Sequence, residues 1–400
     1  MSPKEFSQRI GKSVKTHQVK LEPNAHMRKA IEDLFNYHRY CWNQALGTWN
    51  SLYDQANLLE DKALRPNGSE VRNILVADKQ DWQYKLSARV LQQTVGQLEK
   101  AWKNFFNPNM PNHMRPKFKA KKNYKPSFTT DRARLVNGRL VLDKPSGIDK
   151  SCWYGIRLRE KVRFDGSLKL CTITQKADGL YASLVIETEY EPILPKKQDI
   201  AGVDVNVKHF NYNDGVVNIY PRKLDKYYQR ITHYQKMLAR KREENPYNFR
   251  TKRYTKVKTK LRRDYQKVSN IQKDILHKFT SELVDTYSEI HIEDLNVHTM
   301  MMSKRMGKNL QRSLFGELST ILTYKCDWNN RKLVLVDSSY PSTQLCSECG
   351  YRKTTESYGG KQTLSGDSIY HEHQTYRCYN CGAILDRDEN AVENIKNYVA

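Results

Sequence analysis

The sequence predicts a multidomain α+β and α/β protein, in which a β-barrel with a helical insertion precedes an α/β unit that carries a metal-binding ribbon. Three observations lead to this prediction. Strand-like segments surround a long stretch of helical period, further strands alternate with helices in the second half, and two Cys-x-x-Cys pairs lie near the end. The 400 residues are enough for two or three folded units with their own cores.

The first half of the chain is expected to form the barrel and its insertion. Residues 14–21 alternate like a half-buried strand, and Asn24 can cap the helix that follows Pro23. Two segments of helical period then follow, at residues 31–49 and 86–105. Further strands are expected at residues 134–143, 153–159, 168–175 and 180–189. Helices placed between strands in this way indicate a barrel that is interrupted by a helical segment.

The second half alternates strands and helices. Strands are expected at residues 200–207, 216–220, 289–293 and 332–336. A helical hairpin divided at Asn245-Pro246 follows the second strand, and a helix at 314–328 precedes the last one. This order is typical of an α/β unit.

These elements divide the chain into four parts, and a linker at 192–197 separates the two halves. The β-barrel is expected at residues 1–23 and 127–198, the helical insertion at 24–126, the α/β unit at 199–343 and 384–400, and the ribbon at 344–383.

The chain is strongly basic. It has 68 Lys and Arg against 44 Asp and Glu, a net charge of +24, which favours nucleic acid as the first partner to consider and acidic membrane surfaces as the second. Residues 1–15 contain no apolar core of signal-peptide length, and no run of about 18 apolar residues occurs. We therefore expect no membrane span and no secretion by the usual signal.

Two stretches concentrate the positive charge. Residues 100–130 contain eight Lys or Arg, no acid and several aromatic residues, and residues 222–267 contain 17 Lys or Arg against four acids. A solvated surface is the alternative, but interleaved aromatic and basic residues are typical of nucleic-acid contacts. The candidate contacts are Lys103, Lys117, Lys119, Lys121, Lys122, Lys252, Arg253, Lys256 and Lys260.

The eight cysteines fall into two groups. Four of them, Cys41, Cys152, Cys171 and Cys326, are scattered among apolar or aromatic neighbours and are expected to be inert. The other four form the pairs Cys346/Cys349 and Cys378/Cys381, each followed by glycine, and predict one tetrahedral Zn²⁺ site. His371 and His373 lie in the spacer, so a mixed Cys/His site is the alternative. Four protein ligands leave no open position, which predicts a structural ion.

Three carboxylates stand out by their position. Asp204 and Glu293 interrupt the ends of apolar strands, and Asp388 precedes an expected helix. A single such residue is more often a cap or turn residue. Three of them in one α/β unit can converge on a pair of Mg²⁺ ions about 3.5–4 Å apart, which would activate water against a phosphodiester.

These segments resemble the TnpB proteins of bacterial and archaeal insertion sequences, which are relatives of the single-effector type V CRISPR nucleases. The resemblance rests on Gly202-Val-Asp-Val205, Ile292-Glu-Asp-Leu295, Tyr340-Pro-Ser-Thr-Gln-Leu-Cys-Ser-Glu-Cys-Gly350, Cys378-Tyr-Asn-Cys-Gly382 and Asp386-Arg-Asp-Glu-Asn-Ala-Val-Glu-Asn-Ile395. Their order and spacing match as well, and a weaker likeness extends over nearly the whole chain.

The resemblance implies an RNA-guided endonuclease that cuts double-stranded DNA beside a short target-adjacent motif. Its guide RNA would come from the end of its own transposon. The barrel would be a wedge domain that grips the RNA, and the α/β unit an RNase H-like RuvC domain with an inserted zinc ribbon. The expected partners are thus guide RNA and double-stranded DNA, in the cytoplasm and at the nucleoid of a prokaryote.

The resemblance also assigns roles to single residues. Asp204, Glu293 and Asp388 take the places of the metal-binding catalytic triad, and Asp388 is preferred to Asp386 because it lies two places before Asn390. Asp386 would contact the residues that bind the metal without binding the metal itself. Gln92 falls where the family reads the adjacent motif, although a helix-surface glutamine is the alternative. Asn206 replaces a common glycine, and asparagine tolerates left-handed backbone geometry.

Two rival functions share much of this pattern. A non-cleaving RNA-guided repressor should have lost one of the three carboxylates, and all three are present. A strand-transfer transposase would usually need its own module for binding DNA ends, and the sequence shows no such module.

Overall fold

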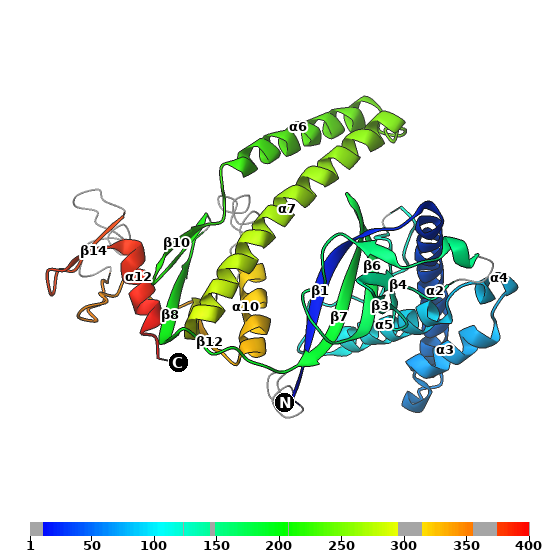
Figure 1. Cartoon of the computed structure of the whole chain (residues 1–400), viewed down its shortest axis with the longest axis horizontal. Helices are drawn as coiled ribbons and strands as arrows, with labels where there is room; N and C mark the ends of the chain where they lie inside the picture. Colours follow the sequence, from blue (N-terminus) through cyan, green and yellow to red (C-terminus); the bar gives the residue numbers. More distant parts are fainter. Residues whose placement is uncertain are drawn as a thin grey trace. The chain divides into compact units, whose positions relative to one another are not determined.

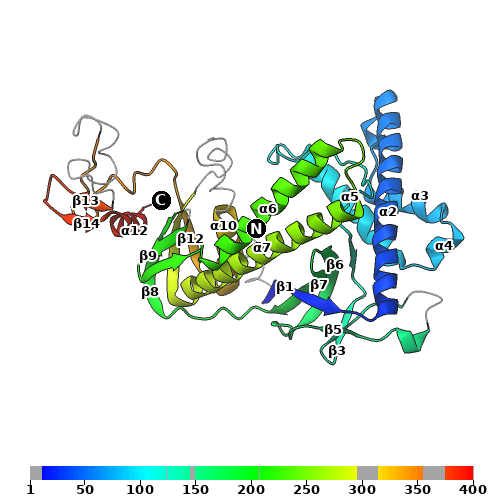
Figure 2. The same cartoon turned by 90° about the horizontal axis from the view of Figure 1, so that it is seen from above.

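The computed structural model describes residues 11–122, 124–144, 149–206, 208–294, 314–354 and 374–399. The chain forms two compact units, Lys12–Glu189 and Tyr190–Ala400, and Met1–Gly11 belongs to the second (Figures 1 and 2). Both units mix helices with sheet, which confirms the predicted α+β character at this coarse level. Within the described residues, no helix combines the length and the apolar character that crossing a membrane requires.

A seven-stranded antiparallel sheet organises the first unit, in the order β2-β6-β7-β1-β5-β4-β3. Its strands are β1 (Lys12–Glu22), β2 (Ser127–Thr130), β3 (Arg134–Val136), β4 (Arg139–Val141), β5 (Ile156–Leu158), β6 (Ser167–Lys176) and β7 (Gly179–Glu189). The long pairing of β1 with β7 brings the start of the unit to its end, as the barrel prediction requires. Between the described strands no hydrogen bonds join β2 to β3, so the sheet stays open at these two ends.

The sequence predicted one strand at 134–143, but the structure has the hairpin β3–β4. Asn137 and Gly138 both adopt positive φ, at 49° and 70°. An Asn-Gly pair is a strong signal for a two-residue hairpin turn, because both positions require left-handed backbone geometry. The two short strands pair antiparallel through Leu135 and Leu140.

The helices of the first unit lie between β1 and β2 in sequence. They are α2 (Ala25–Leu58), α3 (Gly68–Ala77), α4 (Asp81–Tyr84) and α5 (Ala88–Phe106), with short 3₁₀ turns at Lys62–Leu64 and, later, Lys150–Cys152. Asn24 caps α2 as predicted, because its Oδ1 accepts a hydrogen bond from Met27 N at 2.7 Å. The apolar faces of α2 and α5 share a core in which Trp49 stacks on Trp102.

A five-stranded mixed sheet organises the second unit, in the order β10-β9-β8-β11-β12. Its strands are β8 (Lys197–Val205), β9 (His209–Tyr212), β10 (Gly215–Asn218), β11 (Tyr287–Glu293) and β12 (Lys332–Val336). The first three are antiparallel, whereas β8, β11 and β12 are parallel. The carboxyl ends of β8 and β11 therefore meet at one edge of the sheet. The short strand β9 was not predicted, because its two middle residues, Phe210 and Asn211, are both buried and break the alternation.

Helices cover both faces of this sheet. The helices of the second unit are α6 (Lys223–Glu244), α7 (Lys252–Thr286), α10 (Phe315–Asn329) and α12 (Arg387–Lys396), of which α6 packs against α7. Helices α6 and α7 form the predicted hairpin, and α7 and α10 pack on one face while α12 lies against β8 on the other (Figures 1 and 2). A short hairpin of β13 (Thr375–Arg377) and β14 (Ile384–Asp386) leads directly into α12.

Alternation along β8 decides which side chains face which helix. Ala201 and Val203 join the apolar core with α7 and α10. Gly202 and Asp204 point to the opposite face, towards α12. A β-carbon at Gly202 would overlap the backbone of α12, so the glycine allows this helix to approach the strand closely.

Candidate active site and candidate metal centre

The three carboxylates that the sequence singled out come together in the second unit. Asp204 lies near the end of β8 and Glu293 at the end of β11, two parallel neighbours, and Asp388 lies in the first turn of α12. Asp204 is 7% exposed. The negative charges of Glu293 and Asp388 both act on it. The fold therefore gathers three acidic groups at one edge of the sheet.

Electrostatics makes this group unusual. Burial raises the pKa of Asp204 to about 7, and the charges of Glu293 and Asp388 add to the rise, while the side-chain amides of Asn211 and Asn206 oppose it. Burial also raises the pKa of Glu293, against a hydrogen bond from Ser342. Carboxylates that repel one another in a buried site take up either protons or cations. The arrangement is therefore suited to binding a divalent cation.

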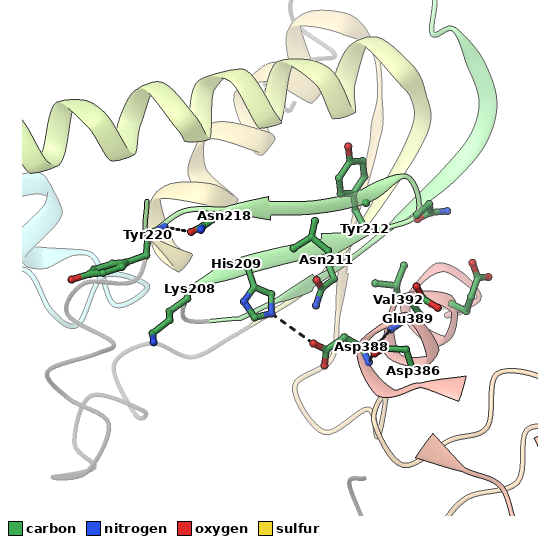
Figure 3. Close-up of a pocket in the computed structure, with 14 residues that line it drawn as sticks. Lys208, His209, Asn211, Tyr212, Asn218, Tyr220, Asp386, Asp388, Glu389 and Val392 are labelled. Carbon is green, nitrogen blue, oxygen red and sulfur yellow. Dashed lines mark hydrogen bonds and ion pairs between the residues drawn. The ribbon is translucent and has the colours of Figure 1, made fainter. Parts of the chain in front are cut away.

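Asp386 and Asp388 play different parts. The Asp386 side chain caps α12, because its Oδ1 accepts from Asp388 N at 2.8 Å and from Glu389 N at 3.1 Å. The Asp388 carboxylate points back towards the sheet (Figure 3), where its Oδ2 lies 3.6 Å from His209 Nε2. Its Oδ1 accepts from Arg387 Nη2 at 2.8 Å. This geometry is consistent with the preference for Asp388 over Asp386.

Three further residues support the carboxylates in ways that the sequence did not indicate. Ser342 donates its hydroxyl to Glu293 Oε1 at 2.8 Å. Asn211 lies opposite Asp204 in the β8–β9 register, and its side chain lowers the pKa of Asp204. Asn206 Nδ2 donates to Asp204 Oδ2 at 2.8 Å, and its φ is not positive, so the asparagine acts through its side chain. Ser342 lies in the Tyr340–Gly350 motif, which offered a signal, whereas Asn211 could be placed only once β9 was known.

A groove of about 760 Å³ opens beside Asp388. Figure 3 shows it between the β9–β10 hairpin and the first turns of α12. Lys208, His209, Asn218 and Tyr220 line one side, and Asp388, Glu389 and Glu393 line the other. Of the three carboxylates, Asp388 lines the groove directly.

The four paired cysteines lie close enough to share one ion. Cys346 Sγ is 3.7 Å from Cys381 Sγ, and Cys349 Sγ is 3.6 Å from Cys378 Sγ. A tetrahedral zinc ion with Zn–S distances of about 2.3 Å separates its sulfurs by about 3.8 Å, so the cluster fits such an ion. Among the described residues, this is the one group of three or more potential ligands whose atoms all lie within 4.8 Å of one another. The three carboxylates are spaced more widely.

Backbone hydrogen bonds favour the thiolate form of Cys349, whereas burial raises the pKa of Cys346 to about 12. Gly350 and Gly382 take positive φ of 71° and 79°, which lets each amide bond back to the first cysteine of its pair. Hydrogen bonds from the Tyr351 amide and from Asn380 lower the pKa of Cys349 to about 6. His371 and His373, the alternative ligands, lie outside the described residues.

Family comparisons match both halves of this site. Residues 183–304, which include Asp204 and Glu293, match the family OrfB_IS605, described as "Probable transposase". Residues 315–395, with Asp388 and the four cysteines, match "Cas12f1-like, TNB domain".

Curated relatives agree with the family matches. A Streptomyces pristinaespiralis protein named "Putative RNA-guided DNA endonuclease" is 26% identical over 318 residues, which are 78% of this chain and 71% of that protein. "TnpB-like protein L79" of Acanthamoeba polyphaga mimivirus is 30% identical over 155 residues, 37% of this chain and 26% of its own length. The chain belongs to the TnpB family. A solved structure described as "Cryo-EM structure of the Cas12f1-sgRNA-target DNA complex" aligns with 97% of this TnpB-family chain and 99% of its own, at 12% identity and a TM-score of 0.48.

The residues predicted to contact nucleic acid in this TnpB-family chain differ in their exposure and in their contacts with other side chains. In the first unit, Lys119 Nζ lies 3.5 Å from the centre of the Trp42 ring, and burial lowers its pKa to about 8. Lys103 pairs with Glu99 at 3.0 Å, and Gln92 accepts from Arg89 Nη1 at 2.8 Å. Lys103 is nevertheless exposed, as are Lys117, Lys121 and Lys122 and, in the second unit, Lys252, Arg253, Lys256 and Lys260 on α7.

Proposed function

We propose that this chain is a metal-dependent, RNA-guided endonuclease that cuts double-stranded DNA next to a short target-adjacent motif. The observation that carries the proposal is the convergence of Asp204, Glu293 and Asp388 at one sheet edge, where burial raises the pKa of Asp204 and Glu293 and the charges of the other two carboxylates raise that of Asp204 further. The guide RNA would derive from the protein's own transposon end, and the protein would act in the cytoplasm and at the nucleoid. The printed name of the Streptomyces relative supports the guided-endonuclease activity.

The three carboxylates would hold two Mg²⁺ ions, which would activate a water molecule and stabilise the leaving oxygen of the phosphodiester. Asn206 orients an Asp204 oxygen and Ser342 a Glu293 oxygen by hydrogen bonds. The groove beside Asp388 would admit the DNA strand.

A single zinc ion held by Cys346, Cys349, Cys378 and Cys381 would be structural. The fit of the sulfur distances supports zinc, and four protein ligands leave no position for a reacting water. The ribbon at 344–383 would thus shape the neighbouring nuclease domain at 199–343 and 384–400.

The remaining parts of the chain would bind nucleic acid. The sheet at 1–23 and 127–198 would be the wedge that grips the guide RNA, and the helices at 24–126 would contact the duplex. Gln92 would read the adjacent motif from α5. Guide pairing delegates sequence recognition to RNA, so a basic protein surface that follows the heteroduplex backbone is sufficient. The net charge of +24 supports this division of labour.

A strand-transfer transposase is the second candidate, because residues 183–304 match a family described as "Probable transposase". A cleavage assay separates the two. Purified protein with its own guide RNA, Mg²⁺ and a plasmid that carries a matched target beside a library of flanking motifs should yield linear plasmid, and EDTA or Asp204→Asn should stop cleavage. Joining of transposon ends without guide RNA would favour the transposase, and guided binding without breaks would favour a repressor.

A further inference from the structure

Residues 342–347 lie between the cysteine cluster and the carboxylates, and they contact both. Cys346 belongs to this segment. At one end, the Ser342 hydroxyl donates to Glu293 Oε1 at 2.8 Å. At the other end, Ser347 N donates to Asn390 Oδ1 at 2.9 Å, and Asn390 follows Asp388 by two residues on α12. This segment therefore contacts Glu293 directly and, through Asn390, the helix turn that carries Asp388.

Two asparagines of α12 fix the backbone of this segment. Asn390 Nδ2 donates to Leu345 O at 2.7 Å, and Asn394 Nδ2 donates to Ser342 O at 2.8 Å and to Leu345 O at 2.9 Å. Asn390 and Asn394 are 1% and 6% exposed. Buried amides that hold two or more hydrogen bonds permit few alternative positions, because a shift would break bonds that water cannot replace. The segment and α12 therefore move as one body.

The ribbon holds the same segment from its other side. Cys346 N donates to Tyr351 O at 3.0 Å, and Lys353 N donates to Gln344 O at 3.0 Å. Tyr376 Oη, from the second half of the ribbon, also donates to Gln344 O at 3.1 Å. An ion in the cysteine tetrad would join the two halves of the ribbon, since each half supplies two sulfurs.

We propose that the ion in the cysteine tetrad sets the positions of Glu293 and Asp388 through residues 342–347, with Ser342, Asn390 and Asn394 as positioning residues. This inference rests on the proposed nuclease function. Groups that hold metal ligands in place typically contribute 10–100-fold to metal affinity or activity. The cysteine cluster thereby controls how tightly the carboxylate site binds its own cations.

Ser342→Ala tests the link to Glu293, with Ser339→Ala as the matched control because the Ser339 hydroxyl bonds to Asp337 instead. In the full chain with guide RNA, we expect Ser342→Ala to raise the Mg²⁺ concentration for half-maximal cleavage at least 10-fold. The maximal rate should return at high Mg²⁺. Mn²⁺ binding, followed by electron paramagnetic resonance without DNA, should weaken to the same extent, while zinc content stays at the wild-type level. An unchanged Mg²⁺ and Mn²⁺ dependence would overturn the inference.

Asn394→Ala tests the link to α12, with the exposed Asn397→Ala at the end of the same helix as its control. Asn394→Ala should also keep its zinc and should weaken Mn²⁺ binding about 10-fold. Cys381→Ser should lose zinc and weaken Mn²⁺ binding at least as much. If the wild type cleaves and these variants bind Mn²⁺ as it does, only the coupling is wrong. If the wild type itself neither binds Mn²⁺ nor cleaves, the proposed function fails together with the inference.

Discussion

Gly202 on β8 lies directly against Val392 on α12: a β-carbon at Gly202 would come within 2.3 Å of the Val392 carbonyl oxygen. It would also lie 2.8 Å from the Lys396 amide nitrogen. Backbone atoms cannot rotate away as a long side chain can, so α12 and its Asp388 keep their place only while residue 202 has no side chain.

Gly202→Ala should therefore displace α12. We expect it to lower the free energy of unfolding by about 1–3 kcal/mol or more, the usual range for overpacking, and to reduce DNA cleavage because Asp388 moves with the helix. Urea denaturation and a cleavage assay measure the two effects. Gly316→Ala in α10 is the control, because a β-carbon there meets nothing within 4 Å. Equal stability of the two variants would contradict the close approach.

The raised pKa of Asp204 makes stability depend on pH in the metal-free protein. The folded state holds a proton on Asp204 up to about pH 7, whereas the unfolded chain releases it near pH 3.9. The free energy of unfolding therefore falls as pH rises from about 4 to 7, and the whole loss is present above pH 7. A pKa shift of this size lowers the free energy of unfolding at high pH by at most about 4 kcal/mol.

Asp204→Asn should accordingly stabilise the metal-free protein at pH 8 and make little difference at pH 4. Urea denaturation at the two pH values, in EDTA, measures the change. Saturating Mg²⁺ should shrink the difference at pH 8, because the cation stabilises the wild type alone. Asp337→Asn is the control, since hydrogen bonds from Ser339 lower the pKa of Asp337 and its substitution should have the opposite sign. A destabilised Asp204→Asn protein at pH 8 would refute the prediction.

Purified protein should contain about one zinc ion per chain, because the four sulfurs fit one tetrahedral site. Inductively coupled plasma mass spectrometry measures the content. Cys378→Ser should lose the ion, while Cys171→Ser, a buried cysteine of the first unit, should keep it. Full zinc content in Cys378→Ser would assign a ligand role to His371 or His373.

Guide RNA binding should weaken steeply with salt, because lysines and arginines replace counterions on phosphates. Changing Lys252, Arg253, Lys256 and Lys260 together to glutamine should flatten the plot of log affinity against log salt. Each lost phosphate contact should remove roughly 0.7–0.9 from the slope. Filter binding at several salt concentrations measures it. Lys119→Gln should leave the slope nearly unchanged, since that ammonium packs on Trp42. If the fourfold variant has the same slope as the wild type, this part of α7 is a solvated surface that does not contact the RNA.

Much of the candidate site could be predicted from the sequence because its signals are local. A Cys-x-x-Cys-Gly segment shapes its own knuckle within five residues, and Gly350 and Gly382 adopt the expected positive φ. Asp204 and Glu293 stand out as charges in apolar strands, and parallel strands place such ends at a common edge. The strands and helices of strong period were predictable for the same reason.

The rest depended on tertiary structure, because the contacts join residues far apart in the chain. The hydrogen bond from Ser342 to Glu293 spans 49 residues, and the one from Ser347 to Asn390 spans 43. The groups that could carry chemistry were visible in the sequence alone: three carboxylates, four thiols and an excess of cations. The fold determined which of these groups lie together and which lysines pack against other side chains instead of facing solvent. It also determined which uncharged side chains hold the carboxylates in place. Burial and hydrogen bonding of this kind arise only where distant segments pack together.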